Sequence, residues 1–175
     1  MAELVLTFDT HPGRTLTLLL YKECKNAREL RGVLKEPTFP QCAFLNGSVV
    51  IDPFIVHLAG HRALVAETSG RKATKSLHTE LLHSISGTKH VPESLKRFGI
   101  TDDSSCVLVA RFDCTPEELD AVRSLVQGIP VPLSELGALA DLPLVDKYYK
   151  ITRAELEGRS RTDAVAFRIG AKDCL

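Results

Sequence analysis

The stretch DPFIVHLAGHRALVAETSGRKATKSLHTELLHSISG, residues 52–87, predicts two helices joined by a short basic turn. Asp52 is a good helix cap because its carboxylate can accept a backbone N–H of the first turn. Pro53 suits the first helical position because its missing N–H would have no partner there. Gly70 favours a helix end, so we expect the first helix to run from Pro53 to about Thr68.

The second helix of this stretch is predicted from four apolar residues at helical spacing. They are Leu77, Leu81, Leu82 and Ile85. The other face is expected to carry Lys75, His78, Thr79 and His83. Gly87 is expected to end the helix as a C-terminal cap, because glycine adopts the left-handed conformation without strain.

Outside this stretch, apolar patterns predict a hairpin and two further strands. Alternation over Leu4–Phe8 and the β-rich run Thr15–Tyr21 indicate two strands around the turn His11–Gly13. A brief strand is expected at Val49–Ile51, and the continuous apolar run Cys106–Phe112 predicts a buried one.

Short helices are expected between and after these strands. Their ranges are about 27–34, 92–98 and 115–128, one or two turns around Leu136 and Val145–Tyr149, and Thr152 to about Arg168. The helices at Thr115 and Thr152 open with capping-box patterns, and Gly99–Ile100 is typical of a helix end with a hydrophobic residue folded back. The pattern predicts an α+β fold, a small mixed and largely antiparallel sheet covered by several helices, as a single domain over residues 1–175.

Composition describes an ordinary globular chain of 175 residues with 44% hydrophobic residues. The N-terminus MAELVLTFD lacks a signal-peptide pattern and no apolar run could span a bilayer, so we expect a soluble, unsecreted protein without membrane contact. Its five cysteines are widely spaced without a CxxC pair, which indicates a reducing compartment rather than disulfides or zinc.

The net charge of zero conceals an uneven distribution of charge along the chain. Residues 61–97 carry seven Lys or Arg against three acids, whereas residues 102–146 carry two against nine. Such blocks predict local charged patches on the surface.

A basic cluster formed by Arg71, Lys72 and Lys75, with Arg62 upstream, allows two interpretations. It is either a solvated helix entrance or a phosphate site that uses these cations and the free N–H groups at the start of the Leu77 helix. Residues 61–97 contain no Phe, Tyr or Trp, so only His or Arg could stack on a base there. A phosphate site would therefore grip a backbone or a chain end.

Motifs for catalysis and for metals are weak. No G-x-G-x-x-G, P-loop or G-x-S-x-G pattern is present, and no local signature surrounds a cysteine. His57 and His61 have zinc-ligand spacing, but the adjacent glutamate of the metalloprotease motif is absent, so we expect surface or packed side chains. Cys106 is expected in the core and Cys174 exposed. We predict no catalytic, cofactor or metal site; a small hydrolase using Cys/His chemistry is the alternative.

Several segments together resemble a known family. They are VVIDPFIVHLAGHRAL, KSLHTELLHSISG, ESLKRFGI, the run Val145–Lys150, the final residues Asp163–Leu175 and TLTLLLYKECKNARELR at Thr15–Arg31. In order and spacing they resemble the TPRKB family, the PRPK-binding subunits of the KEOPS (EKC) complex. The first residues and residues 110–144 match this family poorly.

The resemblance implies a non-catalytic subunit without a cofactor, found in cytoplasm and nucleus. Such subunits bind a PRPK-like atypical kinase, reach the other subunits indirectly, and help hold the tRNA 3′ CCA acceptor end. The complex makes N6-threonylcarbamoyladenosine next to the anticodon of tRNAs. On this basis, tRNA binding is assigned to Arg62, Arg71, Lys72, Lys75 and His78. Kinase binding is assigned to the C-terminal helix Asp163–Ile169 and the tail, through Val165, Ile169 and Leu175.

Overall fold

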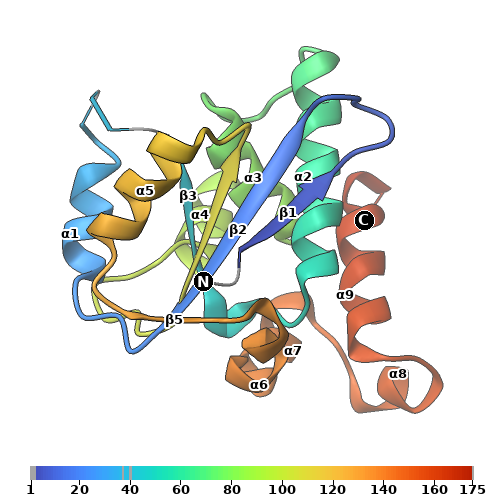
Figure 1. The fold of residues 1–175 in the computed structure, drawn as a ribbon. Coiled ribbons are helices and arrows are strands. Elements are labelled where there is room, and N and C mark those ends of the chain that lie inside the picture. The colour runs from blue at the N-terminus through green and yellow to red at the C-terminus, as the bar shows by residue number, and fades with distance from the viewer. Residues whose placement is uncertain (1–2, 37, 40, 175) are drawn as a thin grey trace.

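The computed structural model describes residues 3–36, 38–39 and 41–174, and over these ranges the chain forms five strands and nine α-helices (Figure 1). The strands are β1 Leu4–Thr7, β2 Thr15–Lys22, β3 Ala43–Asn46, β4 Val107–Phe112 and β5 Ile129–Val131. The helices are α1 Ala27–Val33, α2 Pro53–Thr68, α3 Leu77–Ile85, α4 Val91–Phe98, α5 Pro116–Leu125, α6 Leu136–Leu139, α7 Leu142–Tyr149, α8 Arg153–Gly158 and α9 Arg161–Gly170. Three 3₁₀ turns are η1 Gly47–Val49, η2 Leu133–Glu135 and η3 Lys172–Cys174.

The five strands form one sheet, in which four follow the order β1-β2-β4-β3 and β5 pairs with β2. Every described strand pair is antiparallel. β4 pairs with one edge of β2 over most of its length. The other edge is shared by β1, opposite Thr15–Leu18, and β5, opposite Leu20–Lys22. The predicted α+β fold is confirmed, and its sheet is antiparallel throughout the described pairs.

Helices cover both faces of the sheet, which explains why β2 and β4 carry apolar side chains on both faces. Successive side chains of a strand point to opposite faces. Leu16, Leu18 and Leu20 therefore join the larger core with α2, α3 and α9, whereas Leu19 and Tyr21 join a second core with α1 and α5. Figure 1 shows α1 and α5 on one side of the sheet and α2 and α9 on the other.

Local signals correctly predicted several elements. The hairpin, α1, α4 and β4 lie close to their expected ranges. Asp52 caps α2 by accepting from the Phe54 N–H at 2.7 Å, and Gly70 follows the helix with φ of +66°. The capping box of Thr115 and Glu118 is complete.

In the described ranges no helix is both long and apolar enough to cross a membrane.

The strand predicted at Val49–Ile51 is wrong, and the strand lies earlier, at β3. The chain leaves the sheet after β3, because the Asn46 side chain accepts from the Ser48 N–H and closes the turn η1. Val49 and Val50 are apolar because they are buried in the larger core, not because they pair in a sheet. Strand β5 was not predicted; it is short and contains a proline.

One final helix was predicted from Thr152 to about Arg168, but the structure has two helices there, α8 and α9. The helical run breaks at Arg159, and Ser160 starts α9 by accepting from the Asp163 N–H at 3.0 Å. Thr152 caps α8 by accepting from the Glu155 N–H, and the Glu155 carboxylate also bonds to Arg168.

Two expected helix ends also differ. Gly87 does not cap α3, which ends at Ser86 in extended conformation; instead the Tyr149 ring packs over Gly87. Ile100 does not fold back on α4, because its N–H donates to the Phe44 carbonyl and its side chain enters the second core.

Gly47 provides a test of the turn after β3. A Cβ atom at this position would clash with the Sγ of the buried Cys106, so Gly47→Ala should lower the free energy of unfolding by about 1–3 kcal/mol. The matched control is Gly32→Ala in α1, where no neighbour lies within 4 Å of the new Cβ; there alanine should stabilise by roughly 0.5–1 kcal/mol. Urea unfolding measures both, and equal stability of the two variants would contradict this view of the turn.

Candidate functional site

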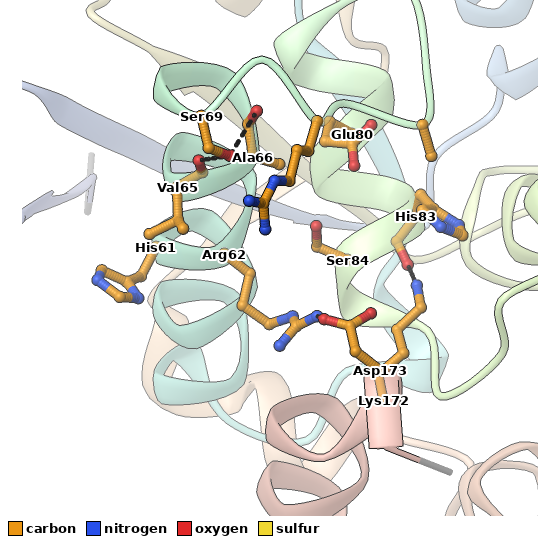
Figure 2. A pocket seen from close by; sticks show the side chains of 12 residues that line it. His61, Arg62, Val65, Ala66, Ser69, Glu80, His83, Ser84, Lys172 and Asp173 are labelled. Atoms are coloured by element: carbon orange, nitrogen blue, oxygen red, sulfur yellow. Dashed lines mark hydrogen bonds and ion pairs between the residues drawn. The ribbon is translucent and has the colours of Figure 1, made fainter.

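A cleft of about 500 Å³ lies between α2, α3 and the C-terminal turn η3 (Figure 2). We call it the α2–α3 cleft. Its lining comprises His61, Arg62, Val65, Ala66, Ser69, Arg71, Ala73, Glu80, His83, Ser84, Lys172 and Asp173. The lining therefore combines two of the predicted tRNA-binding residues, Arg62 and Arg71, with Lys172 and Asp173 of η3.

Arg62 joins helix α2 to the C-terminal turn. Its guanidinium donates to the Asp173 carboxylate at 2.7 Å and to the Gly170 carbonyl at 3.3 Å. The hydrogen bond from Arg62 is the main reason why the pKa of Asp173 lies below its usual value. The side chain of Arg62 is 23% exposed, and its buried Nε finds no hydrogen-bond partner in the described ranges. Arg62 is thus an anion-binding group whose present partner is a carboxylate of the same chain.

Lys172 lines the same cleft and is only 3% exposed. Its Nζ donates to the His83 carbonyl at the end of α3 and to the Ser86 hydroxyl, as Figure 2 shows for His83. Burial, and then the charge of Arg62, lowers the pKa of Lys172 to about 8. A cation suits a helix C-terminus because the last carbonyls lack N–H partners. The sequence carried no local signal for this role.

Arg71 reaches the cleft from the loop between α2 and α3. The loop is held at both ends: the Arg71 N–H donates to the Ala66 carbonyl at 2.8 Å, and the buried Glu80 accepts from the Thr74 N–H and hydroxyl. The Arg71 side chain is exposed and forms no ion pair with any described residue. Its guanidinium is therefore available to an external anion.

Lys72 and Lys75 lie away from the cleft, on a shallow surface that we call the β4 groove. Its charged residues are Arg14, Lys72, Lys75, Arg111, Glu67, Asp113 and Glu118. Most of these charges are already paired; Glu67, for example, accepts from Arg14 at 3.2 Å and from Lys72 at 3.4 Å. The structure thus divides the predicted basic cluster, with Arg62 and Arg71 on one side and the two lysines on the other.

His78 is not on the surface, contrary to the prediction. The side chain is 9% exposed, and its Nε2 accepts from the Phe112 N–H at 3.1 Å. Burial lowers the pKa of His78 to about 4, so the imidazole is neutral at physiological pH. His83, expected on the same exposed face, is 7% exposed. Neither ring offers a face to a nucleic-acid base.

The residues predicted to bind the kinase are mostly unsuited to a docking surface. Val165 and Ile169 are 1% and 0% exposed and belong to the larger core, so the expectation that they are exposed anchors is wrong. Leu175 lies outside the described residues. The exposed apolar side chain on α9 is Phe167, 52% exposed, with the Arg159 guanidinium 5.7 Å from its ring centre.

The histidines of α2 and the cysteines have structural surroundings. His57 Nε2 donates to the Thr7 carbonyl at 2.8 Å, and the described residues contain no group of three side chains suited to a metal. Cys106 is buried and Cys174 exposed, as predicted. Burial raises the pKa of Cys42 to about 12 and that of Cys106 to about 11, so both thiols stay protonated and are poor nucleophiles. Neither Cys42 nor Cys106 therefore supports the hydrolase alternative.

Comparison with known proteins identifies similar chains. The family model described as kinase binding protein CGI-121 matches residues 21–173. The EKC/KEOPS complex subunit TPRKB of Danio rerio is 33% identical over 161 residues, covering 91% of each chain. The EKC/KEOPS complex subunit cgi121 of Schizosaccharomyces pombe is 29% identical over 153 residues, covering 83% of this chain and 87% of that protein. The CGI121 subunit of Yarrowia lipolytica is 27% identical over 161 residues.

The lowered pKa of Lys172 predicts how stability depends on pH. In the unfolded chain this amine returns to its usual pKa of 10.5, so between about pH 8 and 10.5 the unfolded state binds more protons than the folded state. The contribution of Lys172 to the free energy of unfolding should therefore rise with pH over this interval, by at most about 3 kcal/mol.

Urea unfolding of wild type and Lys172→Met, measured at several pH values between 7 and 10, isolates this contribution. The difference in unfolding free energy should shift in favour of wild type as pH rises. Lys147→Met, at an exposed position on α7, is the control. A difference between wild type and Lys172→Met that stays constant across this range would show that the buried amine does not titrate as described.

Proposed function

The chain belongs to the CGI-121 family of kinase-binding proteins, and we propose that it is a non-catalytic subunit of a KEOPS (EKC) complex. In this proposal it binds a PRPK-like kinase, reaches the other subunits through that kinase, and holds the 3′ CCA end of tRNA. The complex would make N6-threonylcarbamoyladenosine next to the anticodon, in cytoplasm and nucleus. The observation that carries the proposal is the family match, which extends from β2 to η3 and so includes every element around the α2–α3 cleft.

The α2–α3 cleft has the chemistry of a phosphate site. Arg71 is exposed and has no described ion-pair partner, and Arg62 can form two parallel hydrogen bonds with phosphate oxygens. Lys172 adds a charge to the same cleft. By contrast, the β4 groove holds most of its cations in internal ion pairs, which an RNA backbone would have to break. We therefore place the acceptor end in the α2–α3 cleft rather than along Lys72 and Lys75.

Asp173 occupies the position that an RNA phosphate would take on Arg62. Its carboxylate lies 2.7 Å from the guanidinium, and 76% of the Asp173 side chain is exposed. Little packing holds this carboxylate in place, so a phosphate can displace it at low cost. The ion pair then acts as an internal competitor for the site, and its removal should strengthen RNA binding.

We still propose that the kinase docks on helix α9, but not through the buried Val165 and Ile169. Phe167 is the large exposed apolar side chain of that helix, and Arg159 lies against its ring. Aromatic and arginine side chains carry much of the binding energy at protein interfaces when a partner covers them. We propose that this pair is covered by the kinase.

Charge variants test the RNA site. Arg71→Glu should lower the affinity for intact tRNA at least about tenfold, and should flatten the dependence of log affinity on log salt by roughly 0.7 for the lost single-strand phosphate contact. Asp173→Asn should raise the affinity, because Arg62 then loses its internal competitor. Filter binding or fluorescence anisotropy at several salt concentrations provides both quantities.

Lys72→Glu is the matched control for position and charge, and it should change the affinity far less than Arg71→Glu. Removal of the CCA tail from tRNA should weaken wild type about as much as Arg71→Glu does. Equal losses in the Arg71 and Lys72 variants would show that the α2–α3 cleft alone does not hold the RNA. Unchanged affinity in both would reject a role for this basic segment.

Size-exclusion chromatography tests the kinase partnership. The purified chain should co-elute with its PRPK-like kinase at micromolar concentration and should show no ATPase, kinase or transferase turnover alone. Phe167→Ala should weaken the complex at least about tenfold, because it removes the proposed anchor. Phe54→Ala, at a 54% exposed position on α2, is the control and should leave the complex intact. Separate elution of the wild-type proteins, or turnover by the chain alone, would refute the proposal.

A further inference from the structure

A second basic groove shares Lys172 with the α2–α3 cleft. It has a volume of about 680 Å³ and is formed by the segment after α3, by α4, and by the ends of α7 and α9. We call it the Tyr148 groove. The residues that matter here are Lys89, Arg97, Tyr148, Lys150, Arg168 and Lys172.

The two hollows adjoin at the C-terminal turn. Lys172 lines both of them. Lys89, from the Tyr148 groove, donates through its Nζ to the carbonyl of Asp173 at 3.3 Å, and the side chain of Asp173 lines the α2–α3 cleft. A flexible chain bound in one hollow therefore needs to cross only this turn to enter the other.

The Tyr148 groove is strongly basic, with five Lys or Arg and one carboxylate, Glu93, among its lining residues. Part of this charge is neutralised, because Arg97 pairs with Glu93 and Arg168 pairs with Glu155. The exposed Lys150 forms no ion pair with a described residue, and Lys89 contacts only a backbone oxygen. The remaining positive charge favours an anionic chain.

Within this groove Arg97 and Tyr148 form a stacked pair. The Arg97 guanidinium lies over the Tyr148 ring, 5.0 Å from its centre, and 32% of the Arg97 side chain is exposed. The pair is held from behind, since Phe98 packs against both Tyr148 and Tyr149 and the Tyr149 hydroxyl donates to the Ile85 carbonyl at 2.6 Å. Guanidinium planes and aromatic rings are the surfaces on which unpaired RNA bases stack.

We infer that the Tyr148 groove is a second subsite for single-stranded RNA, in which one base stacks on the Arg97–Tyr148 pair while phosphates of the same strand bind in the α2–α3 cleft. This inference rests on the proposed function, because it extends the strand held there. The Tyr148 groove supplies the aromatic ring that residues 61–97 lack. Tyr148 and Lys150 come instead from a segment some fifty residues further along the chain.

Short RNA oligonucleotides ending in CCA, of three to six nucleotides, test this inference with the full-length chain. Affinity should rise by about tenfold or more at the length that first reaches the Tyr148 groove, because one stacked base is then added. A 2-aminopurine placed at that nucleotide should be quenched on binding. Tyr148→Leu should abolish the gain and the quenching, whereas Tyr148→Phe, which keeps the ring, should retain both.

Two further variants separate binding from folding. Lys150→Glu, at an exposed position on the groove, should weaken the longer oligonucleotides and spare the trinucleotide. Phe54→Leu removes an exposed aromatic ring that lines neither the Tyr148 groove nor the α2–α3 cleft, and it should leave RNA affinity unchanged. If Tyr148→Leu fails to fold, two results still test the inference. They are the effect of Lys150→Glu on the longer oligonucleotides and the quenching of 2-aminopurine by wild type.

The possible failures are distinguishable. If the trinucleotide binds and depends on Arg71, but longer oligonucleotides gain nothing, this inference is wrong and the proposed function stands. If Tyr148→Leu lowers only the melting temperature, the pair merely fastens α4 to α7, and the inference is again overturned. If neither the oligonucleotides nor tRNA bind, the proposed RNA function fails as well.

Discussion

The burial of helix α3 is the constraint from which both walls of the cleft follow. Of its nine residues all but Thr79 are buried, including His78, Glu80 and His83. Buried polar groups are costly unless they are hydrogen-bonded. The Glu80 carboxylate is satisfied by Thr74 and so holds the loop that carries Arg71; the carbonyl of His83 is satisfied by Lys172, which fixes the C-terminal turn.

The charged residues of the cleft therefore also stabilise the fold, independently of any ligand. Lys172 serves the end of α3, and the Arg62 and Asp173 pair ties α2 to the same turn. These contacts hold the C-terminal turn against α2 and α3. The chain belongs to the CGI-121 family of kinase-binding proteins, and burial keeps its Cys42 and Cys106 thiols protonated.

Much of the fold could be predicted from local signals. Asp52 with Pro53 and the box of Thr115 with Glu118 act within one helical turn, so their structural meaning is contained in a few neighbouring residues. The predictions failed where distant residues decide the outcome. His78 was placed on an exposed face by helical spacing, but β4 covers that face and supplies the Phe112 N–H to its ring. Val49 and Val50 look like a strand because a buried turn and a buried strand need the same apolar side chains.

The sequence by itself determined most helix positions, the helix starts at Asp52 and Thr115, the N-terminal hairpin, the basic segment before α3, and a resemblance to the family that comparison confirms. Only the tertiary structure decided which cations act together. Arg62 meets Asp173 across 111 residues, and Lys172 reaches the end of α3 across 89. Charge patterns along a chain do not reveal such pairings, because the direction of each side chain is set by the packing of α2 against both α3 and α9.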